Sequence, residues 1–212
     1  MKPLFPLALA VLLGACSILP EGEQLTVYRL PATPQAVSTA APVGWALQVD
    51  KPLASPLLDS TRIAVLPEGD RVSAYQGVRW DDRGTRVLRD RLVDAFRADG
   101  RVAAVGSDES RLVTDLALSG DLRAFQGEYR AGRVEVHILL EARLVSGDSR
   151  RMVASRRFEV REPATGTAPA EVVKAFGVAA DRLSREVLEW TLAEGAEVAV
   201  SGPPNSGSRA GF

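Results

Sequence analysis

Residues 133–145 read RVEVHILLEARLV and show the most regular alternation in the chain. Every second residue is apolar, and these residues are Val134, Val136, Ile138, Leu140, Ala142 and Leu144. The residues between them are mostly charged or polar: Arg133, Glu135, His137, Glu141 and Arg143. Side chains of a strand point alternately to its two faces, so this period of two predicts a β-strand with one buried and one solvated face.

The segments on either side, residues 111–125 and 151–161, alternate in the same way. Short loops join the three segments, one holding Gly127 and Gly132 and the other residues 146–149 (SGDS). Alternating strands joined by short loops indicate an antiparallel meander. Further short strands are predicted at residues 25–30, 44–49, 62–66, 71–75, 77–80 and 102–105.

Two segments have the period of a helix instead. In residues 83–98 the apolar face is Leu88, Leu92, Ala95 and Phe96, and in residues 170–192 it is Val172, Phe176, Ala179, Leu183, Val187 and Trp190. Such a stripe buries one side of a helix against another layer. The sequence therefore predicts an α+β fold, with a mostly antiparallel sheet and two amphipathic helices packed on one of its faces.

The composition excludes several classes of protein. The chain has 212 residues, 46% of them hydrophobic, and a formal net charge of -1. This is too apolar and too balanced for a disordered chain, and it lacks the basic excess of a nucleic-acid binder. Its single Cys and single His cannot form a disulfide or an all-protein zinc site, so we expect no metal and no cofactor.

The single Cys is explained by what precedes it. Lys2 is followed by an apolar run over residues 4–13, which is too short to span a membrane but fits a secretory signal. Residues 13–16 (LGAC) resemble the bacterial lipobox, so Cys16 is predicted to carry the lipid anchor. Ser17 stands where Asp would resemble an inner-membrane retention signal, which favours the inner leaflet of the outer membrane, facing the periplasm.

These features predict the organisation of the chain. Residues 1–15 form the lipoprotein signal peptide, residues 16–24 a tether, residues 25–194 the domain, and residues 195–212 a disordered tail rich in Gly, Pro and Ser. Removal of Lys2 makes the mature chain slightly more acidic. Attraction to anionic lipid is therefore not expected to hold it at the membrane, and the acyl chains must do so.

No constellation for catalysis emerges. The sequence has neither a P-loop nor a G-x-S-x-G elbow, and His137 is interpreted as a surface residue of a strand. The acids and arginines around it are expected to form cross-strand charge pairs. The three tryptophans, Trp45, Trp80 and Trp190, are expected to anchor the core or its rim. The prediction is a protein without enzymatic activity.

Taken in order along the chain, these pieces resemble the ABC-type transport auxiliary lipoproteins, including the lipoprotein of the paraquat-inducible intermembrane transport system. The resemblance covers about residues 16–192. It rests on Cys16, residues 28–31 (YRLP), 63–67 (IAVLP), 77–80 (GVRW), 88–92 (LRDRL) and 153–158 (VASRRF), and on Ala175, Phe176 and Trp190.

The resemblance implies an accessory role in moving lipids or hydrophobic compounds between two membranes, beside an MCE-domain protein, a permease and an ATPase. Lipid contact by this subunit itself is left open. Two alternatives also stay open: a lipoprotein that activates a cell-wall synthase, and an envelope hydrolase that uses acids on the sheet.

Overall fold

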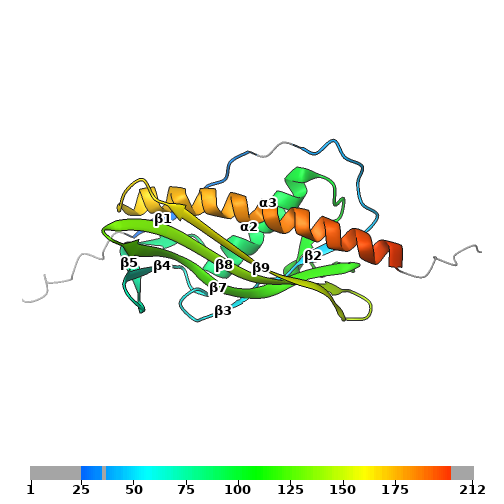
Figure 1. Cartoon of the computed structure of the whole chain (residues 1–212), viewed down its shortest axis with the longest axis horizontal. Coiled ribbons are helices and arrows are strands. Elements are labelled where there is room, and N and C mark those ends of the chain that lie inside the picture. Colours follow the sequence, from blue (N-terminus) through cyan, green and yellow to red (C-terminus); the bar gives the residue numbers. More distant parts are fainter. Residues whose placement is uncertain (1–24, 35–36, 202–212) are drawn as a thin grey trace, which may run out of the picture.

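A computed structural model describes residues 25–34 and 37–201 of the chain, with side chains up to residue 197. The predicted signal peptide, Cys16, Ser17 and the predicted tether lie outside the described residues. The described part forms one curled nine-stranded sheet with two long helices on one face (Figure 1).

Strand β7 (Leu116–Arg130) organises the sheet. One of its edges pairs along its whole length with β8 (Arg133–Ser146) in an antiparallel register, and β8 pairs in turn with β9 (Met152–Pro163), also antiparallel. This β7–β8–β9 meander confirms the prediction from the alternating segments. It forms the long ribbon at the front of the molecule (Figure 1).

The other edge of β7 pairs with three short strands, placed end to end along it. They are β2 (Leu47–Val49), β3 (Leu53–Ala54) and β4 (Arg62–Glu68), and all three run parallel to β7. Beyond β2 lies β6 (Val105–Ser107). Beyond β4 lies β5 (Arg71–Trp80), whose far edge pairs with β1 (Thr26–Tyr28).

The expectation of a mostly antiparallel sheet is therefore wrong. Five of the eight pairings between the described strands are parallel and three are antiparallel, so the sheet is mixed. Each parallel pairing holds only two or three residue pairs. Alternation within a strand shows which residues face the core, but a pairing of so few residues leaves no signal for the direction of the neighbouring strand.

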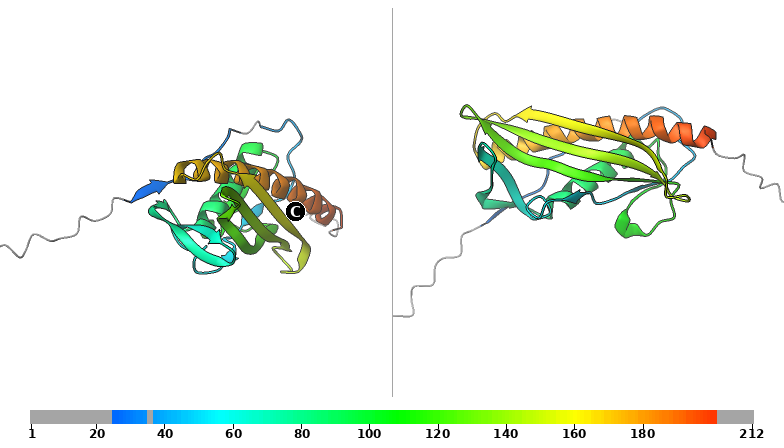
Figure 2. Two further views of the ribbon diagram at one scale, coloured as in Figure 1. Left: turned by 60° about the vertical axis from the view of Figure 1, so that its left-hand side comes forward. Right: turned by 60° about the horizontal axis from the view of Figure 1, so that its bottom comes forward.

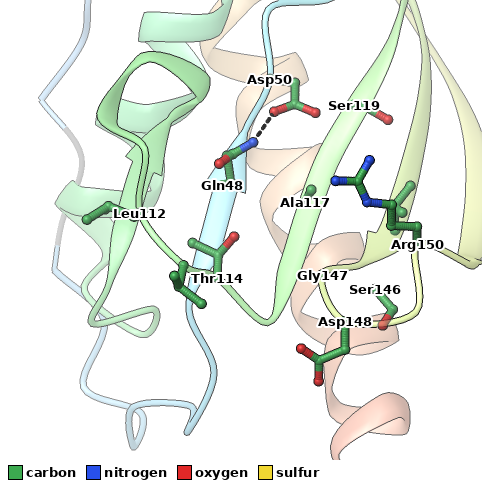
Figure 3. A pocket seen from close by; sticks show the side chains of 12 residues that line it. Gln48, Asp50, Leu112, Thr114, Ala117, Ser119, Ser146, Gly147, Asp148 and Arg150 are labelled. Atoms are coloured by element: carbon green, nitrogen blue, oxygen red, sulfur yellow. Dashed lines mark hydrogen bonds between the residues drawn. The ribbon is translucent and has the colours of Figure 1, made fainter.

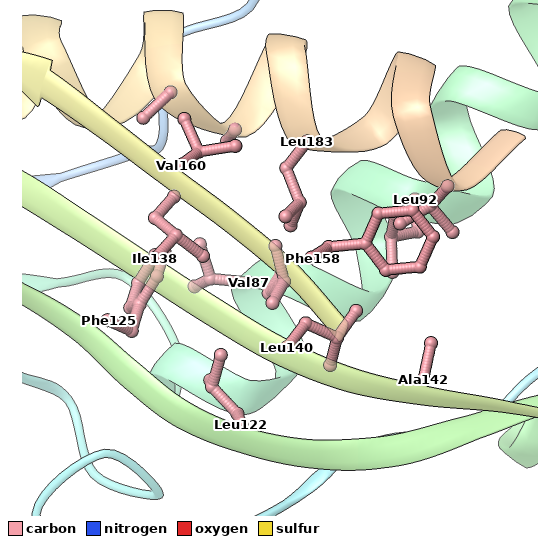
Figure 4. Packing of buried hydrophobic residues seen from close by; sticks show 14 of the residues in the cluster. Val87, Leu92, Leu122, Phe125, Ile138, Leu140, Ala142, Phe158, Val160 and Leu183 are labelled. Atoms are coloured by element: carbon pink, nitrogen blue, oxygen red, sulfur yellow. The ribbon is translucent and has the colours of Figure 1, made fainter. Parts of the chain in front are cut away.

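The two helices, α2 (Gly84–Asp99) and α3 (Pro169–Ser201), lie together on one face of the meander, as predicted (Figure 2). Their predicted apolar residues are all buried. Figure 4 shows Leu92 of α2 and Leu183 of α3 above the apolar face of the sheet, which presents Ile138, Leu140 and Phe158. Trp45, Trp80 and Trp190 also belong to this core, which confirms their predicted role.

Several predicted boundaries need correction. The strands predicted at 71–75 and 77–80 are the single strand β5, and the one predicted at 102–105 is β6. The strand predicted from residue 111 begins at Leu116, because a short 3-10 helix (Asp108–Ser110) and a loop precede it. Helix α3 continues to Ser201, seven residues into the predicted tail. Gly195 is buried there, against Trp45 and Leu116. The remainder of the predicted tail, residues 202–212, lies outside the described residues.

Candidate functional site

The sheet face opposite the helices carries a network of charged side chains centred on Glu128. Its carboxylate lies 2.7 Å from His137 Nδ1 and accepts hydrogen bonds from Arg161 at 2.9 Å and Arg130 at 3.0 Å. The other imidazole nitrogen of His137 lies 3.1 Å from a carboxylate oxygen of Glu159. The predicted cross-strand charge pairs are thus confirmed; those around Glu128 form one connected cluster over β7, β8 and β9, whereas Glu141 and Arg143 pair separately with Arg123 and Asp121 of β7.

His137 is not the surface residue that the sequence suggested, because only 7% of it is exposed. Arg161 covers its ring, with one guanidinium nitrogen 3.2 Å from Nδ1 and 3.4 Å from Nε2. Glu128 is equally buried. Burial opposes the ionisation of this carboxyl, but hydrogen bonds from Arg161, His137, Gln126 and Arg130 outweigh it and lower the pKa of Glu128 to about 2.

This arrangement is suited to holding strands together. A general base needs a free lone pair directed at a substrate, whereas both oxygens of Glu128 already accept hydrogen bonds. In the described part of the chain, no group of three or more His, Cys, Asp or Glu side chains is placed to hold a metal ion. The cluster is therefore suited to a structural role, in which buried hydrogen bonds hold neighbouring strands together.

A cleft of about 530 Å³ opens on this same side of the sheet, where β2 and β7 begin and β8 turns into β9. Figure 3 shows Gln48 donating to Asp50 on one wall and Arg150 and Asp148 on the other. Burial raises the pKa of Asp50, although the hydrogen bond from Gln48 opposes the shift. Val113 projects fully exposed at the rim.

A second cluster holds the segment that follows β1. Arg91 of α2 donates to the carbonyl oxygens of Leu30 and Pro31, and Asp181 of α3 accepts from the backbone N–H of Thr33 at 3.0 Å. Gly177 lets Pro31 approach α3, since a Cβ there would lie 2.9 Å from Pro31. The chain that leads back towards residue 16 is thus fixed to both helices.

Two arginines of α2 lie outside the apolar face that the sequence predicts for this helix. Arg89 and Arg91 fall on the polar face of the predicted helix, yet both are buried. Arg89 pairs with Asp90, Asp108 and Glu109, which ties the 3-10 helix to α2. A helical wheel does not reveal this, because acids of the 3-10 helix and of α3 turn these polar positions into interior ones.

Among the described helices, none combines the length and the apolar composition that a membrane span needs.

The fold is an α+β domain whose polar clusters hold its elements together. A model of the ABC-type transport auxiliary lipoprotein component family matches residues 28–188. The chain belongs to this family, which confirms the resemblance seen in the sequence and makes the chain an auxiliary lipoprotein of ABC-type transport.

Known structures share this fold. The chain is similar to protein XCC0632 from Xanthomonas campestris, family-model DUF330, with a TM-score of 0.75 and 33% identity over 82% of this chain and 99% of that one. A crystal structure of an uncharacterized protein shares the fold at a TM-score of 0.62 and 17% identity, over 79% of this chain and 99% of that one.

A curated relative is longer. Uncharacterized protein bll6063 from Bradyrhizobium diazoefficiens is 29% identical over 167 residues, which cover 76% of this chain. The aligned part spans only 43% of that relative.

Proposed function

We propose that this chain is a non-enzymatic accessory lipoprotein, anchored in the outer membrane, of an intermembrane transport system that moves lipids or other hydrophobic compounds across the periplasm. Its partner in this proposal is the MCE-domain protein of an ABC transport complex that also contains a permease and an ATPase. The observation that carries the proposal is the family match over residues 28–188.

The geometry around the N-terminal segment supports a tethered role. Leu25, the first described residue, follows Cys16 by nine positions. Nine extended residues span about 30 Å, so a lipid on Cys16 would keep the domain within that distance of the membrane. Hydrogen bonds hold Leu30 to α2 and Thr33 to α3. The anchored segment is therefore attached firmly to the folded domain.

The polar clusters favour a role without catalysis. The carboxylate of Glu128, whose pKa is lowered to about 2, accepts hydrogen bonds from several donors. The arginines of α2 pair with acids and with backbone carbonyl groups. Such residues stabilise a rigid domain. Surfaces of a rigid domain, rather than a reacting group, then carry the interaction with a transporter.

Affinity purification tests the partner. The tagged full-length chain is extracted from its own membranes in mild detergent, and we expect the MCE-domain protein, the permease and the ATPase to be recovered with it. The matched control is Cys16→Ala, which keeps the domain but removes the anchor. Recovery of a cell-wall synthase in place of these proteins would support the alternative role instead.

Fractionation tests the anchor and the choice of membrane. On a density gradient, the unaltered chain is expected with the outer membrane, and Cys16→Ala is expected to be released or mislocalised from that fraction. Ser17→Asp is expected to move the protein to the inner membrane. Outer-membrane recovery of Cys16→Ala at the unaltered level would contradict the anchor.

A further inference from the structure

Strand β9 leaves one edge of the sheet without a neighbour in the described residues, since it pairs only with β8. At the C-terminal end of this edge, the carbonyl oxygen of Arg161 accepts a hydrogen bond from Arg182 of α3 at 3.1 Å. Backbone groups that face outward recur at every second residue of a strand. Those of Ser155, Arg157 and Glu159 therefore point to the same side, and no other described strand pairs with them.

The open half of β9, Met152–Glu159, and the turn that precedes it carry more arginines than acids. Arg150, Arg151 and Arg156 form no ion pair with any acid in the described part of the chain. Arg156 instead stacks over the ring of Phe158, with its guanidinium carbon 5.2 Å from the ring centroid. This leaves its guanidinium N–H groups available to an acidic side chain.

Apolar surface adjoins these charges. Met152 is 59% exposed at the start of the strand. It also borders a depression of about 420 Å³ on the face opposite the helices, together with Ser155, Arg157 and Glu141. A chain laid beside β9 would cover this methionine as well as pair with the backbone.

We propose that the edge Met152–Glu159 binds an extended acidic segment of a partner protein, which adds to the sheet as a further strand. The main-chain hydrogen bonds would supply affinity, and a carboxylate facing Arg156 would supply selectivity. The register places Arg156 opposite Ala142, on the helix side of β9, and Arg157 opposite Glu141, on the other side. Arg157 already pairs with Glu159 at 2.8 Å, so an acid in the added strand would meet the unpaired Arg156 on the helix side.

Charges on an edge strand also serve simply to prevent edge-to-edge association. That role and partner binding differ in what happens when the charge is reversed: a guarding arginine can be replaced by glutamate without loss, whereas an arginine that binds an acidic strand cannot. The proposal therefore requires the positive charge of Arg156 and the outward-facing backbone hydrogen-bonding groups of β9.

Site-specific crosslinking in the native envelope tests both. The photoreactive p-benzoylphenylalanine replaces Met152 in the full-length chain, and the crosslinked peptide is mapped by mass spectrometry. We expect an extended, acid-rich segment of another envelope protein. Arg156→Glu is expected to lower the yield about tenfold or more, and Ser155→Pro is expected to do the same by blocking the outer edge. Arg133→Glu, at the other end of the meander, serves as the matched charge reversal and should leave the yield unchanged.

Thermal unfolding of each variant shows whether it folds, and if Ser155→Pro does not fold, Arg156→Glu decides alone. A crosslink to a second copy of this chain, no crosslink from position 152, or a yield that survives Arg156→Glu would each overturn the proposal. The outcome is independent of the proposed transport role, because the captured segment is judged by its composition and not by the identity of its protein.

Discussion

The guanidinium of Arg91 lies 3.5 Å from the carboxylate of Asp181, and only 9% and 6% of the two side chains are exposed. The pair bridges α2 and α3 beneath the segment that follows β1. Arg91 Nε and Asp181 Oδ1 have no hydrogen-bond partner among the described residues. The two side chains therefore bond mainly to the neighbouring backbone and not to each other. The function of the pair is to fix Leu30, Pro31 and Thr33 to the helices.

Replacing one partner of this pair should be strongly destabilising. In Asp181→Ala the Arg91 guanidinium stays buried without its acid, which costs about 3–5 kcal/mol of unfolding free energy. The backbone N–H of Thr33 also loses its acceptor. Urea unfolding measures the first effect, and limited proteolysis within residues 29–34 measures the second.

The control for this prediction replaces both partners. Arg91→Met combined with Asp181→Leu leaves no buried charge, so we expect it to be more stable than Asp181→Ala. Proteolysis near Thr33 should nevertheless stay fast, because neither new side chain can bond the backbone. If the double variant were no more stable than the single one, the unpaired charge would not be the cause of the loss.

Acid should weaken the domain through Glu128. Its pKa is lowered to about 2 in the folded chain, against an ordinary value of 4.5. A lowered pKa contributes stability that is present above pH 4.5 and is lost as the pH falls from there towards 2. We expect Glu128→Gln to reduce unfolding free energy at pH 7 by about 1–3 kcal/mol and to flatten its decline between pH 4.5 and 2.

Glu141→Gln is the matched control for this pH dependence. Glu141 lies on the same sheet face and pairs with Arg123 at 2.9 Å, but both side chains are well exposed. An exposed pair contributes little, so the change should stay within about 1 kcal/mol and leave the acid limb of the stability curve in place. Equal effects of the two variants would show that burial of Glu128 is not what matters.

The aromatic cluster beneath α3 should be sensitive to loss of volume. Phe176 lies with its ring centroid 4.9 Å from that of Phe125 and 5.2 Å from that of Trp80, and it is fully buried. Phe176→Ala is expected to cost about 3–5 kcal/mol, measured by urea unfolding. Val178→Ala, on the exposed side of the same helix, should change stability by less than about 1 kcal/mol.

Periodicity accounts for how much of this fold the sequence predicts. Positions such as Ile138 and Leu183 repeat at strand or helix spacing, and that spacing alone assigns them to the interior. The parallel pairings of β2, β3 and β4 with β7 carry no such signal, since they depend on contacts between residues far apart in sequence. A bulge at Arg123 also exchanges the two faces of β7 midway along the strand, which a strict alternation does not anticipate.

The polar clusters are harder to predict for a related reason. His137 and Arg91 occupy positions that a strand pattern or a helical wheel assigns to solvent. They are buried because Arg161, Asp181 and other partners come from different elements. Only the predicted cross-strand charge pairs gave a local indication of the Glu128 network, through the regular placement of acids and arginines on neighbouring strands.

The end of α3 offers a direct test of where the folded domain stops. An added Cβ at Gly195 would lie 2.5 Å from one ring atom of Trp45 and 2.8 Å from another. Gly195→Ala gains about 1 kcal/mol of helix propensity, but the buried indole must move, and such overpacking costs about 1–3 kcal/mol. We therefore expect a net loss of stability in urea unfolding and altered tryptophan fluorescence.

The reverse change at an exposed position of the same turn, Ala193→Gly, is the control and should cost about 1 kcal/mol and leave the fluorescence unchanged. If Gly195→Ala instead raised stability, the packing of Trp45 against this turn would be excluded, and the domain would end before Gly195 as the composition of the chain suggests.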